Sequence, residues 1–234
     1  MPGRKICVFC GSSPGLDPRF LRAAYQLGVL LAQERLQLVY GGGARGCMGS
    51  LADGVLSAGG EVLGVAPKFL GSVEDRHQRL THFEFAQNLA ARKLRMLDLS
   101  DAVIVLPGGT GTLDELLEVL TMKRVGRVNH PLIVVNLAGF FRPLTYLLEH
   151  LIESGFAGSD QLALCHWVDS PVAALQHLRD VFSDHAACGL RCCACGEPAA
   201  RNAPVLARIC GGDRCRLRDA SIQHPARHCV GRHR

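Results

Sequence analysis

Aromatic residues and long apolar runs are scarce in this chain. Its 234 residues include one Trp and three Tyr, and no aromatic residue follows Phe182. No apolar stretch approaches the roughly 18 residues that a membrane span needs. The five-residue apolar run before Gly11 is too short for the core of a signal peptide. We therefore expect a cytoplasmic protein with no membrane segment, in a compartment that keeps thiols reduced.

Net charge is nearly absent from residues 1–184 and concentrated in residues 185–234. The chain carries +5 overall, and the last 50 residues hold nine Arg against three acids, together with seven of the 11 Cys. We therefore expect two parts: a domain over residues 1–184 and a basic, Cys-rich appendage over residues 185–234. Nucleic acid is a weak candidate partner for this appendage, because it has no aromatic side chains to stack on bases and offers only nonspecific attraction to phosphate.

Two cysteine pairs in the appendage have spacings typical of a metal site. Cys192 and Cys195 are followed, after 14 intervening residues, by Cys210 and Cys215. Four thiolates spaced in this way suit tetrahedral zinc. Our hypothesis is a structural zinc in a knuckle-like fold, and the alternative is a disordered Cys-rich tail.

Short apolar runs alternate with amphipathic segments through the first 184 residues. The runs predict strands at 5–10, 36–40, 61–65, 80–85, 102–106, 131–135 and 164–168. The segments between them predict helices at 18–34, 47–58, 88–99, 112–125, 141–154 and 171–182. Continuous apolar strands separated by helices indicate an α/β fold, a doubly wound, Rossmann-like parallel sheet.

Glycine-rich loops follow three of the expected strands. They read "GSSPG" from Gly11, "GGGARG" from Gly41 and "PGGTGT" from Pro107. Loops at the carboxyl ends of parallel strands share one rim, where backbone N–H groups and helix N-termini suit a phosphate. The bland alternative is that these glycines only shape tight turns.

A dinucleotide site is a weaker interpretation of the second loop. Gly41, Gly43 and Gly46 have the spacing of the dinucleotide fingerprint, which would make the chain an oxidoreductase. The acid about 20 residues further on, Glu61, begins the next expected strand, whereas the ribose-binding acid of that fold ends one. The nucleoside triphosphate loop is also absent, because no Gly-Lys-Ser/Thr occurs.

The third loop ends in "TLDE", and Glu115 has two interpretations. Thr112 and Glu115 fit a capping box, in which both side chains bond to the backbone at the start of a helix. In that case Glu115 would have a structural role only. The other interpretation is that Glu115 faces the ligand held by the loop.

The motifs "YGGGARGCMG", "RK" at 92–93 and "PGGTGTLDE" together resemble the Lonely Guy (LOG) family of nucleoside 5′-monophosphate phosphoribohydrolases. The resemblance covers about residues 4 to 182. It implies an enzyme that hydrolyses the N-glycosidic bond of AMP or N6-prenylated AMP (cytokinin nucleotides), giving free base and ribose 5-phosphate. It also implies a homodimer and no cofactor for catalysis. The alternative function is a non-catalytic nucleotide-binding module whose tail contacts protein or nucleic acid.

The resemblance places the catalytic pair at Glu115 and Arg92. We expect the N-terminus of the helix to help keep Glu115 ionised. The chain departs from the family at Leu89 and Ala90, where Met-His is usual, so its base preference is open. The expected substrate- and phosphate-binding residues are Gly108, Gly109, Thr110, Gly111, Thr112, Lys93, Gly42, Gly43 and Ser12.

Overall fold

The computed structural model describes residues 1, 3–70 and 76–189. Its strands are β1 (Lys5–Phe9), β2 (Gln37–Tyr40), β3 (Val62–Pro67), β4 (His82–Ala86), β5 (Ala102–Val105), β6 (Leu132–Val135) and β7 (His166–Val168). Its α-helices are α1 (Pro18–Gln33), α2 (Gly46–Ser57), α3 (Leu89–Asp98), α4 (Thr110–Arg124), α5 (Arg142–Glu153) and α6 (Pro171–Gly189). The predicted α/β class is confirmed, and each predicted strand and helix overlaps one of these elements, although some ends differ.

The seven strands form one parallel sheet in the order β4-β3-β2-β1-β5-β6-β7. The first four strands progress outward from β1 in one direction, and β5 returns to pair with the other side of β1. The strand order therefore reverses between β1 and β5. In doubly wound folds the loops on either side of such a reversal diverge and leave a crevice for ligands.

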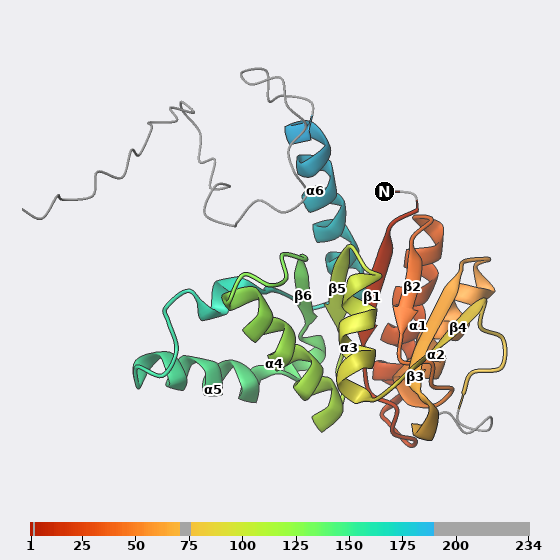
Figure 1. The fold of residues 1–234 in the computed structure, drawn as a ribbon, viewed down its shortest axis with the longest axis horizontal. Coiled ribbons are helices and arrows are strands. Elements are labelled where there is room, and N and C mark those ends of the chain that lie inside the picture. The colour runs from red at the N-terminus through yellow and green to blue at the C-terminus, as the bar shows by residue number, and fades with distance from the viewer. Residues whose placement is uncertain (2, 71–75, 190–234) are drawn as a thin grey trace, which may run out of the picture. The chain divides into compact units, whose positions relative to one another are not determined.

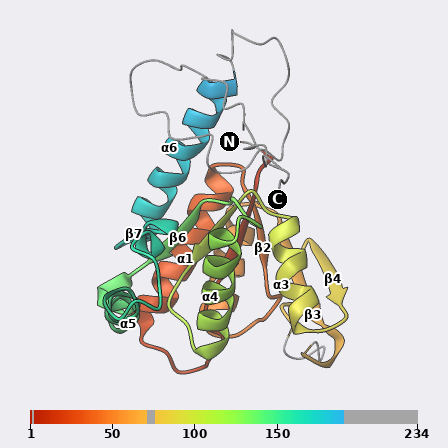
Figure 2. The same cartoon turned by 60° about the vertical axis from the view of Figure 1, so that its left-hand side comes forward.

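Helices cover both faces of the sheet (Figures 1 and 2). Buried side chains of α1, α2 and α6 pack on one face, and those of α3, α4 and α5 pack on the other. The five central strands, β1, β2, β3, β5 and β6, are almost entirely buried between these layers, which explains why they are apolar without alternation. The edge strands β4 and β7 have exposed residues. The central strands and the carboxyl-end loops that follow them are thus held on a rigid base.

Two helices begin at caps that are visible in the sequence. Asp17 accepts a hydrogen bond from the Arg19 N–H (2.8 Å) and Pro18 opens α1, while Asn88 accepts one from the Ala91 N–H (2.8 Å) at the start of α3. Helix α3 carries Arg92 in its first turns. The Asn88 cap therefore sets where that guanidinium enters the site.

The predictions for the appendage lie outside the described residues. This applies to the proposed zinc ligands Cys192, Cys195, Cys210 and Cys215. Helix α6 continues to Gly189, past the boundary predicted at residue 184. No helix within residues 1, 3–70 and 76–189 is long and apolar enough to cross a membrane.

Candidate active site

Three loops meet at the carboxyl end of the sheet, where the strand order reverses. The Gly11 N–H, after β1, donates to the Pro107 carbonyl, after β5 (3.1 Å). The Gly11 carbonyl accepts from the Met48 N–H at the start of α2 (3.2 Å). These backbone bonds hold the loops after β1, β5 and β2 together around one point.

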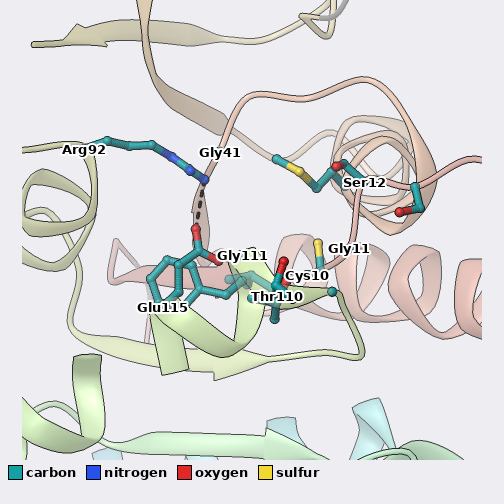
Figure 3. A pocket seen from close by; sticks show the side chains of 14 residues that line it. Cys10, Gly11, Ser12, Gly41, Arg92, Thr110, Gly111 and Glu115 are labelled. Carbon is teal, nitrogen blue, oxygen red and sulfur yellow. Dashed lines mark ion pairs between the residues drawn. The ribbon is translucent and has the colours of Figure 1, made fainter. Parts of the chain in front are cut away.

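A cavity of about 270 Å³ opens between these loops. Its walls are the end of β1 with residues 11–13, Gly41 and Met48 from the second loop region, and Arg92 from α3. Residues 109–112 and Glu115 complete it from α4. Figure 3 shows Arg92 reaching across the cavity towards Glu115, with Thr110 and Gly111 beside Glu115.

The amino end of α4 opens into this cavity without a side-chain cap. The helix begins at Thr110 with Gly109 as its N-cap residue, and the Leu113 N–H makes its first internal bond, to the Gly109 carbonyl (3.1 Å). The N–H groups of Thr110, Gly111 and Thr112 therefore have no carbonyl acceptor within the helix. Such N–H groups, at the positive end of a helix dipole, form a binding site for an anion.

The capping-box interpretation of Thr112 and Glu115 is wrong. Thr112 is the third residue of α4 and Glu115 the sixth, so neither is placed to cap a helix that begins at Thr110. Both side chains instead line the cavity and are buried. The predicted helix start at residue 112 was two residues too late, because the observed start, Thr-Gly-Thr from Thr110, has no conventional N-cap signal.

The glycines of this loop divide into packed and open positions. A Cβ on Gly108 would lie 2.6 Å from the Thr112 Cβ and 2.8 Å from the Gly11 nitrogen. A Cβ on Gly109 or Gly111 would meet no atom within 4 Å. Gly108 thus allows the loops to pack, whereas Gly109 and Gly111 leave space beside the free N–H groups.

Arg92 and Glu115 form an ion pair in the cavity wall. The Arg92 Nη2 lies 3.1 Å from the Glu115 Oε1, and the Arg92 Nε donates to the Val65 carbonyl (3.1 Å). The guanidinium also passes over Gly41, where any Cβ would overlap it and would lie 2.6 Å from the Met48 Cε. A Cβ at position 41 would therefore push the ends of the Arg92 and Met48 side chains out of these positions.

Burial outweighs the help that we expected from the helix end in keeping Glu115 ionised. Burial raises the pKa of Glu115 to about 7, although Arg92 acts to lower it. The carboxyl group is only 7% exposed and sits in the second turn of α4, whereas the helix dipole acts mainly within the first turn. Glu115 is therefore poised to hold or release a proton near neutral pH.

Lys93 lies beside the site rather than in it. Its Nζ lies 2.7 Å from the Asp114 Oδ2 and 2.7 Å from the Glu118 Oε2, which ties α3 to the outer side of α4. Burial opposes the charged form, but these two carboxylates prevail and raise the pKa of Lys93. Lys93 does not line the cavity.

The remaining predicted binding residues differ in position. Ser12 lines the cavity, whereas Gly42 and Gly43 do not. The Gly42 carbonyl accepts from the His77 N–H (3.0 Å) and the Gly43 carbonyl from the Tyr40 hydroxyl (3.2 Å), so both face protein.

The predicted site residues omit seven residues that line the cavity, namely Val8, Phe9, Cys10, Gly11, Ser13, Gly41 and Met48. Ser13 and Gly41 stand next to predicted residues, so their loops were a usable signal, whereas nothing in the sequence distinguishes Cys10 or Met48 from core residues.

Within residues 1, 3–70 and 76–189, no three His, Cys, Asp or Glu side chains are grouped to hold a metal ion.

Comparison with known proteins identifies relatives over much of the described part of the chain. The family model described as "Possible lysine decarboxylase" matches residues 48–178. A cytokinin riboside 5′-monophosphate phosphoribohydrolase of Rhodococcoides fascians is 37% identical over 177 residues, which cover 74% of this chain and 89% of the relative. The enzyme of that name called LOG7, from Arabidopsis thaliana, is 40% identical over 153 residues, covering 65% and 70%.

Solved structures share the fold at lower identity. A molybdenum cofactor binding protein from Rippkaea orientalis has a TM-score of 0.59 at 23% identity, covering 78% of this chain and 99% of that protein. The molybdenum cofactor carrier protein from Chlamydomonas reinhardtii has a TM-score of 0.61 at 19% identity, covering 77% and 98%. At these identities the similarity concerns the fold alone.

Proposed function

The chain belongs to the LOG family of phosphoribohydrolases, which are N-glycosyl hydrolases, and from that premise we propose that it hydrolyses purine nucleoside 5′-monophosphates, AMP and N6-modified AMP among them. The products are free base and ribose 5-phosphate. The observation that carries the proposal is the buried Glu115–Arg92 pair (3.1 Å) beside an uncapped helix N-terminus in one cavity. An anion site and a titratable acid lie close together in this cavity. They suit a substrate whose phosphate binds at the helix end and thereby holds the glycosidic bond near the acid.

The amino end of α4 binds the 5′-phosphate. The N–H groups of Thr110, Gly111 and Thr112 donate to the phosphate oxygens, and the open side of Gly109 and Gly111 admits them. The ribose then extends along the cavity towards Glu115, about one turn of helix further on. Phosphate binding thus places the sugar against the acid.

Glu115 acts on the sugar carbon. Water forms a bond to C1′ while the C1′–N bond breaks and its electron pair leaves with the base, so positive charge builds on the ring in the transition state. The ionised Glu115 carboxylate stabilises that charge and takes a proton from the water. Arg92 is permanently protonated, and it stabilises the negative charge on the departing base.

Substitution of Glu115 tests this function. The protein and its Glu115→Gln variant are incubated with AMP and with N6-isopentenyl-AMP, and free base and ribose 5-phosphate are measured by chromatography. We expect a loss of kcat of at least about 1,000-fold with nucleotide binding retained, because Gln fills the same space without a carboxylate. The control is Asp114→Asn, which removes the adjacent acid; its side chain is 65% exposed and does not line the cavity, so most turnover should remain.

Two outcomes would contradict the proposal. Undiminished turnover in Glu115→Gln would remove this acid from the mechanism. Absence of turnover in the unmodified protein, with nucleotide binding intact, would favour the non-catalytic binding module.

We also propose that the protein is a homodimer through the surface of α3 and α4. Leu94 is 43% exposed on α3 and Leu117 is 41% exposed on α4, and the Lys93 ion pairs join these two helices. Apolar side chains on such a surface suit burial against a second copy. Light scattering should give a dimer for the unmodified chain and a monomer for Leu117→Lys, and a monomer in both would contradict the assignment.

A structural zinc ion in the appendage is a separate proposal. It rests on the spacing of Cys192, Cys195, Cys210 and Cys215 alone. Metal analysis of the full chain should give one zinc per chain, and Cys192→Ser with Cys195→Ser should lose it. Retention of full zinc in that double variant would contradict the ligand set.

A further inference from the structure

Two adjacent cations of α3 contact α4 at separate points. Arg92 meets Glu115 in the cavity wall, with its Nη2 3.1 Å from the Oε1. The Lys93 Nζ lies 2.7 Å from the Asp114 Oδ2 and 2.7 Å from the Glu118 Oε2. Neighbouring residues of a helix point about 100° apart, so the two side chains leave α3 in different directions. Two such contacts fix the rotation of α3 relative to α4, whereas one ion pair alone would leave the helices free to pivot.

The Lys93 side chain is mostly buried, and stability alone does not explain a charge in that place. It is 13% exposed, and burial opposes its charged form, although the two carboxylates raise its pKa overall. An ion pair removed from water adds little net stability, because desolvation offsets the attraction, and an apolar side chain of similar volume often serves as well. A methionine would fill this space with no charge to desolvate. The cation beside the catalytic pair therefore points to a role in the reaction.

Charges of both signs act on Glu115 from the elements around it. Burial is the main cause of its raised pKa, the cations of α3 (Arg92 and Lys93) oppose that rise, and the acids of α4 (Asp114 and Glu118) add to it. The thiols of Cys7 and Cys10 also face this acid, but burial raises their own pKa values well above neutral, so they carry no charge there. Without Lys93, the two acids of α4 would lose their counter-charge and oppose ionisation of Glu115 more strongly.

From these contacts we propose that Lys93 is a positioning residue of the reaction. Its ammonium, bound by two carboxylates of α4, holds α3 against that helix so that Arg92 and Glu115 keep their geometry. It also neutralises the acids beside Glu115, which must be ionised to take a proton from water. Lys93 does not line the cavity and touches no reacting atom. The proposal rests on the function proposed above and adds to it a residue that acts through the catalytic pair.

The experiment measures kcat and KM for AMP between pH 5 and 9 in the unmodified protein, Lys93→Met, Glu118→Gln and the double variant. Activity rises as Glu115 ionises, so the pH midpoint of kcat/KM reports this acid. The phosphate of AMP titrates alike in every assay, so differences between midpoints belong to the protein. We expect the midpoint to rise by roughly 0.5–1 pH unit in Lys93→Met, which loses a cation, and to fall by a similar amount in Glu118→Gln, which loses an acid. The double variant loses one charge of each sign and should return most of the way to the unmodified midpoint.

The positioning effect is measured by kcat above the midpoint, where Glu115 is ionised in every protein. In Lys93→Met and in the double variant kcat should fall by roughly tenfold to a hundredfold, as expected for a catalytic group displaced by about 1 Å. KM should change little, because the N–H groups of residues 110–112 are unaltered. Glu118→Gln keeps the Asp114 contact and should lose less. The control is Arg95→Met, which removes a cation of α3 that is paired with Glu84 of β4 (2.8 Å), and it should change neither kcat nor the midpoint.

Other outcomes would overturn the proposal. Undiminished kcat in Lys93→Met would show that the catalytic pair keeps its geometry without this lysine. Midpoints that stay fixed, or that move in the same direction in both single variants, would leave Lys93 with a structural role only, as would a lowered Tm with no shift. If Lys93→Met does not fold, the double variant, which has no unpaired Glu118 carboxylate, carries the same test. If the unmodified protein cleaves no nucleotide, the proposed function fails, but ¹³C NMR titration of the Glu115 carboxyl in these proteins still decides whether Lys93 acts on this acid.

Discussion

The glycine-rich loops at 41–46 and 107–111 look alike in sequence but differ in what their glycines face. Each follows a buried parallel strand and leads into a helix whose N-cap residue makes no side-chain capping bond, α2 in one case and α4 in the other. In the first loop the Met48 N–H of α2 is used by the Gly11 carbonyl. In the second loop Thr110 and Gly111 line the cavity, and their N–H groups have no acceptor within the helix.

Space around the glycines shows the same difference. Gly46 has a φ of +58°, and a Cβ there would lie 2.6 Å from the Ser13 carbonyl oxygen. Gly111 has no atom within 4 Å of the corresponding point. The first loop is glycine-rich so that protein can pack against protein, and the second so that a ligand can approach the backbone. A glycine pattern alone therefore does not tell which loop binds the phosphate.

The largest expected effect is that of Gly46→Ala on stability. A left-handed φ costs a non-glycine residue about 1–2 kcal/mol, and the clash with the backbone of Ser12 and Ser13 adds about 1–3 kcal/mol. We expect a loss of about 2–5 kcal/mol in the free energy of unfolding, measured by urea denaturation. Gly59→Ala is the matched control, since Gly59 has a φ of +74° with no atom within 4 Å, and should lose only about 1–2 kcal/mol. Equal losses in the two variants would show that crowding at position 46 is unimportant.

A pH-dependent gain in stability is expected for Glu115→Gln. The folded-state pKa of Glu115 is raised from 4.5 to about 7, so the folded protein holds this proton more tightly than the unfolded chain. Stability from this group is complete below pH 4.5 and is lost as pH rises to 7, by about 3 kcal/mol. Gln carries no charge and avoids this loss, so the variant should equal the unmodified protein near pH 4.5 and exceed it by about 3 kcal/mol at pH 8.

Urea denaturation of both proteins between pH 5 and 8 measures this difference. Asp114→Asn serves as the control, because its exposed carboxylate should produce no gain of that size. A difference between Glu115→Gln and the unmodified protein that does not change with pH would contradict the raised pKa. The expected gain indicates that burying the ionisable Glu115 lowers the free energy of unfolding of the protein above neutral pH, a cost that function can require.

The fold could be predicted from the sequence because its signals are local. Fully buried parallel strands produce continuous apolar runs, and Asp17 and Asn88 mark the starts of their helices. The doubly wound class implies a reversal of strand order, but its position between β1 and β5 was not predicted, since it depends on pairings between distant segments. The rim with its loops was nevertheless identified, because parallel strands place their carboxyl ends together.

The site was predicted less completely, for two physical reasons. Which glycine faces the cavity depends on loop packing, so Gly42 and Gly43 were included and Gly41 was missed. The protonation of Glu115 depends on burial by neighbouring elements, which the sequence does not reveal. The family resemblance identified Glu115 and Arg92, but it did not show that burial outweighs Arg92 in setting the pKa of Glu115.

The smallest expected effect on stability, and the sharpest test of the comparison, comes from Gly111→Ala. Gly111 is the second residue of α4, where Ala should stabilise the helix by about 0.5–1 kcal/mol, and nothing in the protein obstructs its methyl group. The methyl group would occupy the space that we assign to the phosphate. We therefore expect an unchanged or slightly raised Tm together with a KM for AMP raised roughly tenfold, the equivalent of about 1.4 kcal/mol. An unchanged KM would mean that the phosphate does not approach Gly111, whereas a lowered Tm would mean that this glycine, like Gly46, serves packing.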